Sequence, residues 1–203
     1  MPLATIEPDF AVVAALLAYL SGSIPFGPIV ARARGVDLTK VGSGNIGATN
    51  VARTLGKKLG ALVLLGDALK GTLPVLAARA VFADSSWLHW ITAAVAAAAF
   101  LGHLYPITLG FKGGKGVATG LGVFIALAPV PTLIAGGVFV VIYLVFRIAS
   151  VGSLVATTVM PFAMWALGAP RPTMVLAVLL WAIIVYKHRG NIARLRRREE
   201  TKV

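Results

Sequence analysis

A polar, glycine-rich run at residues 42–53 reads GSGNIGATNVAR, within a chain that is otherwise strongly apolar. Closely spaced glycines let several backbone N–H groups converge on one oxyanion, and a nearby arginine can hold that anion with two hydrogen bonds. A helix that begins near Thr49 would add its dipole. The run is compatible with a flexible hinge or with a phosphate site. In the second case the polar groups are Ser43, Asn45, Thr49, Asn50 and Arg53.

A second glycine-lysine cluster, FKGGKGVAT, occupies residues 111–119. It is not a nucleotide-binding P-loop, because residue 109 is leucine and Gly116, rather than serine or threonine, follows the lysine. A turn whose lysines anchor two helix ends is the structural alternative. The density of lysine and glycine favours a second anion site, formed by Lys112, Lys115 and the intervening or flanking glycines Gly113, Gly114 and Gly116.

Two histidines lie in short motifs that could take part in proton transfer. His103 is part of GHLYP, and His188 is part of KHRGN, which also contains Asn191. Either imidazole can accept a proton from a substrate hydroxyl near neutral pH. A histidine that only closes a helix end is equally compatible with both motifs, so the residues alone assign no base.

Further polar groups lie inside or beside apolar segments. Asp67 and Lys70, three residues apart in LGDALKG, share one helical face and can form an ion pair. They either fix helix packing or support a site. Ser150 and Ser153 in RIASVGS lie at a helix junction, where a serine is often only a cap.

The carboxylates are too dispersed to hold Mg²⁺ beside a phosphate, so we expect no metal and no cofactor. Cysteine is absent from the sequence, which excludes disulfides and a cysteine acyl-enzyme, and no serine lies in a GxSxG motif. The acidic residues are Glu7, Asp9, Asp37, Asp67, Asp84, Glu199 and Glu200.

The elements that position these groups are apolar helices. The 203 residues are 58% hydrophobic and 13% charged, with a mean hydropathy of +0.88, which indicates an all-α integral membrane protein with one domain, residues 1–203. We expect seven transmembrane helices, although the fourth and seventh segments are short and leave six as an alternative. The apolar segments are 10–31, 59–81, 87–107, 117–130, 131–148, 151–167 and 173–186.

The distribution of basic residues predicts the orientation. With the N-terminus outside and the C-terminus in the cytoplasm, all of the 19 lysines and arginines except Lys70, Arg79 and Arg171 lie on the inner face. The first segment follows acidic rather than basic residues, so we expect it to be an uncleaved helix. The net charge of +12 is explained by this topology and by anionic lipid, without nucleic acid. Both glycine clusters then face the cytoplasm.

Five motifs in order, GSGNIGATNVAR, LGDALKG, GHLYP, FKGGKGVAT and HRGNIARL, resemble the acyl-phosphate-dependent glycerol-3-phosphate acyltransferases, the PlsY family. The resemblance extends from Tyr19 to Leu195; the tail, LRRREE, departs from the family pattern. It implies transfer of a fatty acyl group from acyl phosphate to the primary hydroxyl of glycerol-3-phosphate. The products are lysophosphatidic acid and phosphate, in the first acylation step of phospholipid synthesis. The family implies metal-free chemistry in which the donor phosphate accepts the hydroxyl proton.

The resemblance also implies a role for each matched residue. Catalytic residues are Lys115, Arg53, His188 and Asn191. Substrate-binding residues are Ser43, Asn45, Thr49, Asn50, Lys112, Gly113, Gly114, Gly116, Ser153 and His103, with Ser153 preferred over Ser150.

The implied setting is the bacterial cytoplasmic (inner) membrane, with the lipid bilayer and a soluble acyl-phosphate-forming enzyme as partners. A membrane transporter for a phosphorylated solute is the alternative function, since basic residues and broken helices also form anion pathways. A cytidine-nucleotide-dependent lipid phosphotransferase would need a carboxylate metal site that the sequence lacks.

Overall fold

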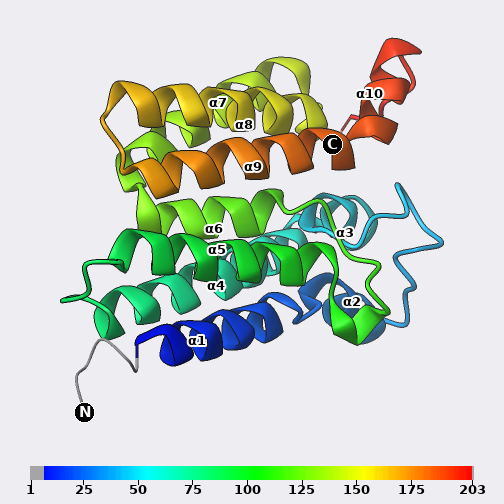
Figure 1. Cartoon of the computed structure of the whole chain (residues 1–203). Helices are drawn as coiled ribbons and strands as arrows, with labels where there is room; N and C mark the ends of the chain where they lie inside the picture. The colour runs from blue at the N-terminus through cyan, green and yellow to red at the C-terminus, as the bar shows by residue number, and fades with distance from the viewer. Residues whose placement is uncertain (1–6, 203) are drawn as a thin grey trace.

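The computed structural model describes residues 7–202 and is all-helical over that range, which confirms the predicted class. The outermost residues of the predicted domain lie outside the described part. Long helices lie side by side, with α1 against α5 and α4, α4 against α6, and α7 against α8 (Figure 1). The helices are α1 Glu7–Gly22, α2 Phe26–Arg32, α3 Ala48–Leu55, α4 Lys57–Val81, α5 Leu88–Leu104, η2 Ile107–Leu109, α6 Val117–Leu127, α7 Pro129–Phe146, α8 Ala149–Ala166, α9 Arg171–Lys187 and α10 Arg189–Arg196.

Within the described residues, five helical segments are long and apolar enough to cross a membrane. A sixth results if α9 and α10, which meet at 54°, count as one span. The predicted fourth segment is α6, whose 11 residues extend about 16 Å, against a hydrocarbon core of about 30 Å. Much of α6 is buried by protein, and Arg79 of α4 donates a hydrogen bond to the carbonyl of Ala126 at its end. The short helix is thereby shielded from lipid over much of its surface.

The first predicted helix, residues 10–31, is broken in the structure: α1 ends at Gly22 and α2 begins at Phe26. Pro25 has no N–H to donate and disfavours helical geometry at Ile24. Two carbonyls freed by the break are satisfied by other elements. The Ile24 carbonyl accepts from Lys70 Nζ at 2.8 Å, and the Ser23 carbonyl accepts from Thr108 Oγ1 at 2.7 Å. The predicted first segment therefore corresponds to one apolar span, Pro8–Arg32, with an interruption at residues 23–25 that the sequence pattern did not predict.

Glycines allow the closest helix contacts in the bundle. A Cβ added at Gly102 of α5 would lie 2.2 Å from the Tyr19 carbonyl oxygen of α1. A Cβ added at Gly122 of α6 would lie 2.0 Å from the Ala68 carbonyl oxygen of α4. Small residues at such crossings are typical of helices packed in membranes.

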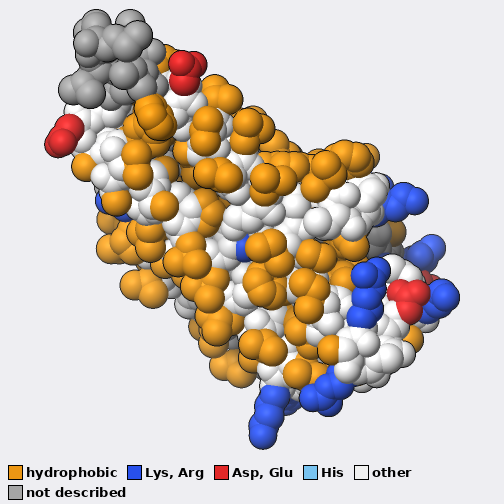
Figure 2. Space-filling view, turned by 90° about the horizontal axis from the view of Figure 1, so that it is seen from below, with side chains coloured by type: hydrophobic (Ala, Val, Ile, Leu, Met, Phe, Trp, Pro, Cys, Tyr) orange, Lys and Arg blue, Asp and Glu red, His pale blue; other side chains and the backbone are white. Residues whose placement is uncertain are grey.

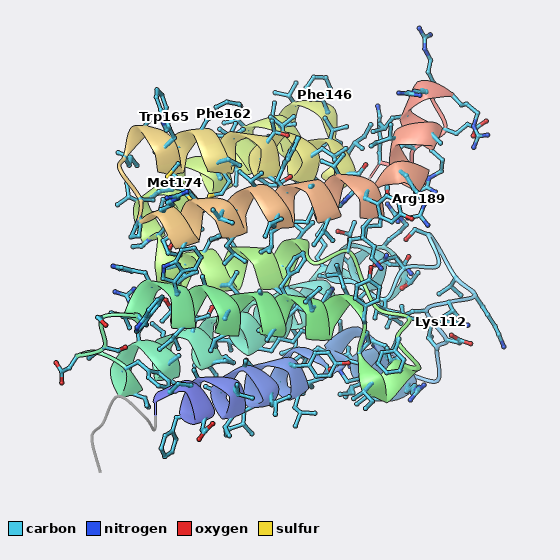
Figure 3. All side chains as sticks on the ribbon, in the orientation of Figure 1. Lys112, Phe146, Phe162, Trp165, Met174 and Arg189 are labelled. Atoms are coloured by element: carbon cyan, nitrogen blue, oxygen red, sulfur yellow. The ribbon has the colours of Figure 1, made fainter. Side chains whose placement is uncertain are left out.

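The outer surface is apolar along the bundle and basic at one end. Figure 2 shows hydrophobic side chains over most of the visible face and lysine and arginine side chains gathered at one end. Phe162 and Trp165 project outward from α8 in Figure 3 and are 68% and 73% exposed. Lys112 and Arg189 lie at the opposite end of the molecule, where α2, α3 and α10 also lie (Figures 1 and 3). We refer to this end as the polar end.

Candidate active site

A pocket of about 150 Å³ opens at the polar end and joins segments that are far apart in the sequence. Its walls come from the 42–53 run, from the start of α6, from α8 and from the α9–α10 junction. Of the predicted site residues, all but three line it. These are Ser43, Asn45, Thr49, Asn50, Arg53, His103, Lys115, Gly116, Ser153, His188 and Asn191.

The three predicted residues outside the pocket lining belong to the second cluster. Lys112 is exposed to solvent. Gly113 and Gly114 lie behind the pocket, where their N–H groups donate to the carbonyls of Leu104 and His103 at 3.1 and 3.2 Å. Their backbone donors therefore tie the loop to the end of α5.

Four helices begin at the pocket wall. The lining includes first-turn residues of α3 (Ala48, Thr49), of α6 (Val117) and of α8 (Ala149), and the N-cap of α10, His188. Within residues 7–202, no side chain forms a capping hydrogen bond at the N-terminus of any of these four helices. Uncapped N-termini present free N–H groups and the positive ends of helix dipoles, so the wall favours anions.

Asn50 of α3 organises the loop that precedes this helix. Its side chain is 1% exposed, and its Nδ2 group donates to the carbonyl oxygens of Leu38, Val41 and Asn45 at 2.8–3.2 Å. Its Oδ1 accepts from the Ser43 N–H at 2.9 Å. The Asn50 amide is thus occupied by loop backbone, which makes its contribution to the pocket one of shaping the loop.

Arg53 supplies a free donor to the pocket. One of its terminal nitrogens donates to the Thr201 carbonyl at 3.4 Å. Its Nε is buried without a hydrogen-bond partner among the described residues. A buried guanidinium nitrogen without a partner is costly, and an anionic ligand in the pocket would satisfy it.

Lys115 brings the second positive charge into the pocket. Its Nζ donates to Asn191 Oδ1, which links the glycine-lysine loop to α10. Gly116 adopts φ +86°, and an added Cβ there would lie 2.3 Å from the Phe100 ring, so both the turn and the close contact require glycine. Burial is the main cause that lowers the pKa of Lys115 to about 8; Glu200 opposes the shift, and Arg194 and Arg53 add to it.

We expect activity to fall in alkaline solution as Lys115 loses its proton. The folded pKa of about 8 lies below the ordinary value, so the ammonium form is retained below pH 8 and lost above it. The value of kcat/KM should fall by about tenfold per pH unit once this lysine is mostly neutral. A pH profile of the purified enzyme tests this, with Lys115→Arg as comparison, because a guanidinium stays charged. An identical alkaline fall in Lys115→Arg would contradict the assignment.

Two further predicted groups complete the wall. His188 Nδ1 lies 2.8 Å from the Ile184 carbonyl oxygen, so Nδ1 must carry the proton, and in the neutral ring Nε2 holds the lone pair. Ser153 donates to the Ala149 carbonyl at 2.8 Å. Ser150, which the sequence ranked lower, also lines the pocket.

Glu200 is a pocket residue that sequence reasoning missed. Its carboxylate accepts from Ser150 Oγ at 2.9 Å, from Asn191 Nδ2, and from Arg194 Nε at 2.6 Å. Burial raises the pKa of Glu200, but these hydrogen bonds lower it more, so the net shift is downward. The only sequence signal was an acidic pair after a basic run. Glu200 reaches the pocket because the chain turns at Arg198, which has φ +59°.

We expect Glu200→Gln to lower both stability and activity. The substitution removes the charge that faces Arg194 and turns one acceptor oxygen into a donor, which then faces either Arg194 or both Asn191 and Ser150. A charged hydrogen bond of this kind contributes about 1.5–3 kcal/mol. The matched control is Glu199→Gln, whose side chain is 57% exposed. Thermal unfolding and initial rates should separate the two variants; equal behaviour would show that the Glu200 contacts do not order the pocket.

The fold and the pocket define a class: an all-helical, multi-pass membrane protein with an anion-favouring pocket at one end. A family model described as glycerol-3-phosphate acyltransferase matches residues 12–198. The chain therefore belongs to the glycerol-3-phosphate acyltransferase family. It is an acyltransferase, which confirms the resemblance and the enzyme prediction.

Individual relatives agree with this assignment. The glycerol-3-phosphate acyltransferase of Anaeromyxobacter sp. (strain K) is 53% identical over 91% of this chain and 93% of its own. That of Aquifex aeolicus (strain VF5) is 47% identical over 89% of this chain and 92% of its own. The crystal structure of PlsY (YgiH), an integral membrane glycerol 3-phosphate acyltransferase, in its glycerol 3-phosphate form superimposes with a TM-score of 0.90, at 44% identity over 95% of both chains. Its lysophosphatidic acid form gives 0.87, at 43% identity over 95% and 94%.

Proposed function

We propose that this chain transfers a fatty acyl group from acyl phosphate to the primary hydroxyl of glycerol-3-phosphate, and releases lysophosphatidic acid and phosphate. The observation that carries the proposal is the pairing of Arg53 of α3 and Lys115 of the loop before α6 in one pocket with four helix N-termini. Donor and acceptor each carry a phosphate, and each of the two cations can hold one of them. The similar structure with lysophosphatidic acid supports the product.

The chemistry requires little more than positioning and charge. The glycerol hydroxyl oxygen attacks the acyl carbonyl carbon, the bond from that carbon to the phosphate oxygen breaks, and the leaving phosphate takes the hydroxyl proton. Lys115, with the N–H groups at the start of α6, stabilises the negative charge that develops on the carbonyl oxygen. Arg53 holds the phosphate of glycerol-3-phosphate. His188 and Asn191 orient the reactants beside Lys115.

The finer topology is part of this proposal. Figure 1 shows that α1, α4, α5, α6, α7, α8 and α9 run alternately between the two ends of the bundle, which supports seven crossings with α6 as the short one. The basic polar end would face the cytoplasm of a bacterial cell, with the N-terminus outside. The chain has no cysteine, so Lys40→Cys and Asp84→Cys can be labelled singly with a membrane-impermeant thiol reagent. Labelling of Lys40→Cys from outside intact cells would contradict the orientation.

The donor and the metal independence can be tested together. Purified protein receives glycerol-3-phosphate with acyl phosphate, acyl-CoA or acyl carrier protein in parallel, each with and without a chelator. We expect lysophosphatidic acid from acyl phosphate alone, at the same rate in both conditions. Product from acyl-CoA, or loss of product with the chelator, would contradict the proposal. Uptake of glycerol-3-phosphate into proteoliposomes without donor would instead support a transporter.

A further inference from the structure

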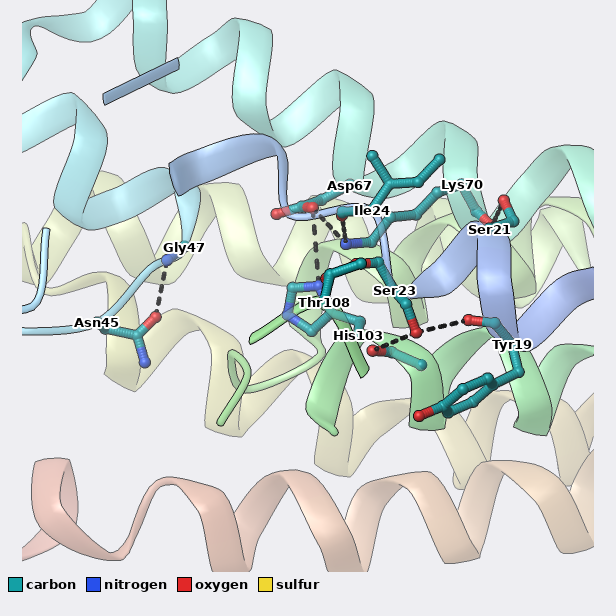
Figure 4. Close-up of polar contacts among 11 residues, drawn as sticks. Tyr19, Ser21, Ser23, Ile24, Asn45, Gly47, Asp67, Lys70, His103 and Thr108 are labelled. Atoms are coloured by element: carbon teal, nitrogen blue, oxygen red, sulfur yellow. Dashed lines mark hydrogen bonds and ion pairs between the residues drawn. The ribbon is translucent and has the colours of Figure 1, made fainter. Parts of the chain in front are cut away.

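A buried ionic cluster lies beside the pocket and has no part in the chemistry described so far. Lys70 Nζ and Asp67 Oδ1, both on α4, are 2.8 Å apart, and their side chains are 3% and 4% exposed. His103 Nδ1, on α5, lies 3.6 Å from the same carboxylate oxygen (Figure 4). Charged groups are costly in a membrane protein interior, so their presence here points to a specific task.

The cluster also reaches the broken first helix. Lys70 Nζ donates to the Ile24 carbonyl, one of those freed by the break between α1 and α2 (Figure 4). A small cavity of about 10 Å³ is lined by Asp67, Lys70, His103 and the break itself. Asp67 and His103 line the large pocket as well. The cluster therefore stands between the break and the site.

The His103 residue is in direct contact with the glycine-lysine loop. A Cβ added at Gly114 would lie 2.3 Å from His103 Nε2, and one added at Gly113 would lie 2.1 Å from the His103 carbonyl oxygen. That carbonyl accepts the Gly114 N–H at 3.2 Å. Lys115 is the next residue in the chain. The ring and carbonyl of His103 thus set where the backbone that carries Lys115 can lie.

We propose that Asp67, Lys70 and His103 are positioning residues, which hold the glycine-lysine loop so that Lys115 lies in the pocket. Asp67, which is held by Lys70 on α4, faces His103 Nδ1 at 3.6 Å and limits where the ring can lie. The ring and backbone of His103 in turn fix the loop at Gly113 and Gly114. The inference rests on the proposed role of Lys115. The Asp67–Lys70 pair then supports the position of Lys115, in addition to satisfying the Ile24 carbonyl at the break between α1 and α2.

The test must separate positioning from a general loss of folding. Replacing one partner of the pair alone would leave an unpaired buried charge and destabilise the protein whatever its task. The double variant Asp67→Asn/Lys70→Met removes both charges and keeps similar side-chain volumes. His103→Leu removes the ring nitrogens, and His103→Asn retains a donor near the position of Nδ1. Asp84→Asn and His89→Asn are matched controls, because both residues are exposed in the 82–90 region.

We expect the double variant and His103→Leu to remain folded and to lose about 30- to 100-fold in kcat, because a misplacement of about 1 Å can cost 10²-fold. His103→Asn should recover part of that loss, and the controls should keep parental rates. Parental kcat in His103→Leu, or in the double variant, would overturn the proposal.

A second measurement reads the position of Lys115 without relying on catalysis. Amine labelling followed by peptide mass spectrometry, as a function of pH, reports the pKa of Lys115, which burial lowers to about 8. If the loop moves, Lys115 becomes more exposed, and its labelling midpoint should shift toward the ordinary lysine value of about 10.4. An unchanged midpoint in a folded variant that has lost activity would overturn the positioning role, and would leave the proposed role of Lys115 intact.

Discussion

Lys115→Ala is expected to abolish most of the activity while the protein still inserts and purifies normally. Removal of one donor that stabilises transition-state charge costs about 10²–10³ in kcat, and here the group lost is a full charge in a partly buried pocket. Loss of its hydrogen bond to Asn191 also unties the glycine-lysine loop from α10. We therefore expect at least about a 10³-fold fall in kcat/KM, measured as lysophosphatidic acid formed from acyl phosphate.

The matched control is Lys58→Ala, a lysine at the exposed start of α4. It removes the same charge from the same end of the bundle and should leave the rate within about twofold, because exposed charges are strongly screened. A near-parental rate in Lys115→Ala would remove this lysine from the site. An equal loss of activity in Lys115→Ala and Lys58→Ala would show that the effect comes from net surface charge.

Arg53→Ala is expected to produce the second large effect, mainly on the use of glycerol-3-phosphate. The Arg53 Nε is buried and unpartnered in the described structure, so its hydrogen bonds remain available for a ligand. A bidentate charged contact with phosphate is stronger than a neutral one, and we expect KM for glycerol-3-phosphate to rise by about 10²-fold. KM for the acyl donor should change much less.

Arg53→Lys tests the geometry of that contact. A lysine keeps the charge but loses the planar fork, so the variant should recover only part of the affinity. Arg34→Ala, an exposed arginine in the loop before the glycine run, is the control and should be close to parental. A rise in KM for the acyl donor alone would assign Arg53 to the other phosphate.

The residues with local sequence signals are brought together by the fold. The polar groups of the 42–53 run, together with Lys115, His188 and Asn191, line one pocket, and their roles in binding and catalysis stay predictions. The sequence could not distinguish the two lysines of the second cluster; in the structure Lys115 lines the pocket and Lys112 is exposed to solvent. The predicted segment 10–31 forms one apolar span, but hydropathy averages over the interruption at Pro25, where Lys70 of α4 and the Thr108 side chain satisfy the freed carbonyls.

Glu200 illustrates what a local reading cannot find. Its carboxylate meets Ser150, which is fifty residues earlier in the chain, and the contact exists only because a turn at Arg198 folds the tail onto the start of α8. The composition of the tail does not reveal this turn, because an extended basic tail lying on a membrane surface would have the same composition. The family spacing favoured Ser153 over Ser150, and it gave no sign that Ser150 would line the pocket and contact Glu200.

By itself, the sequence determined the membrane class and most of the apolar helical segments, and it predicted two anion-binding clusters, because hydropathy and glycine spacing act over a few neighbouring residues. Only the tertiary structure decided which groups share the pocket and which support it from behind. Four helix N-termini meet there, and Asp67, Lys70 and His103 lie against the loop, through close contacts between helices that are remote in the chain. Such contacts depend on how the whole bundle packs, and no short stretch of sequence encodes them.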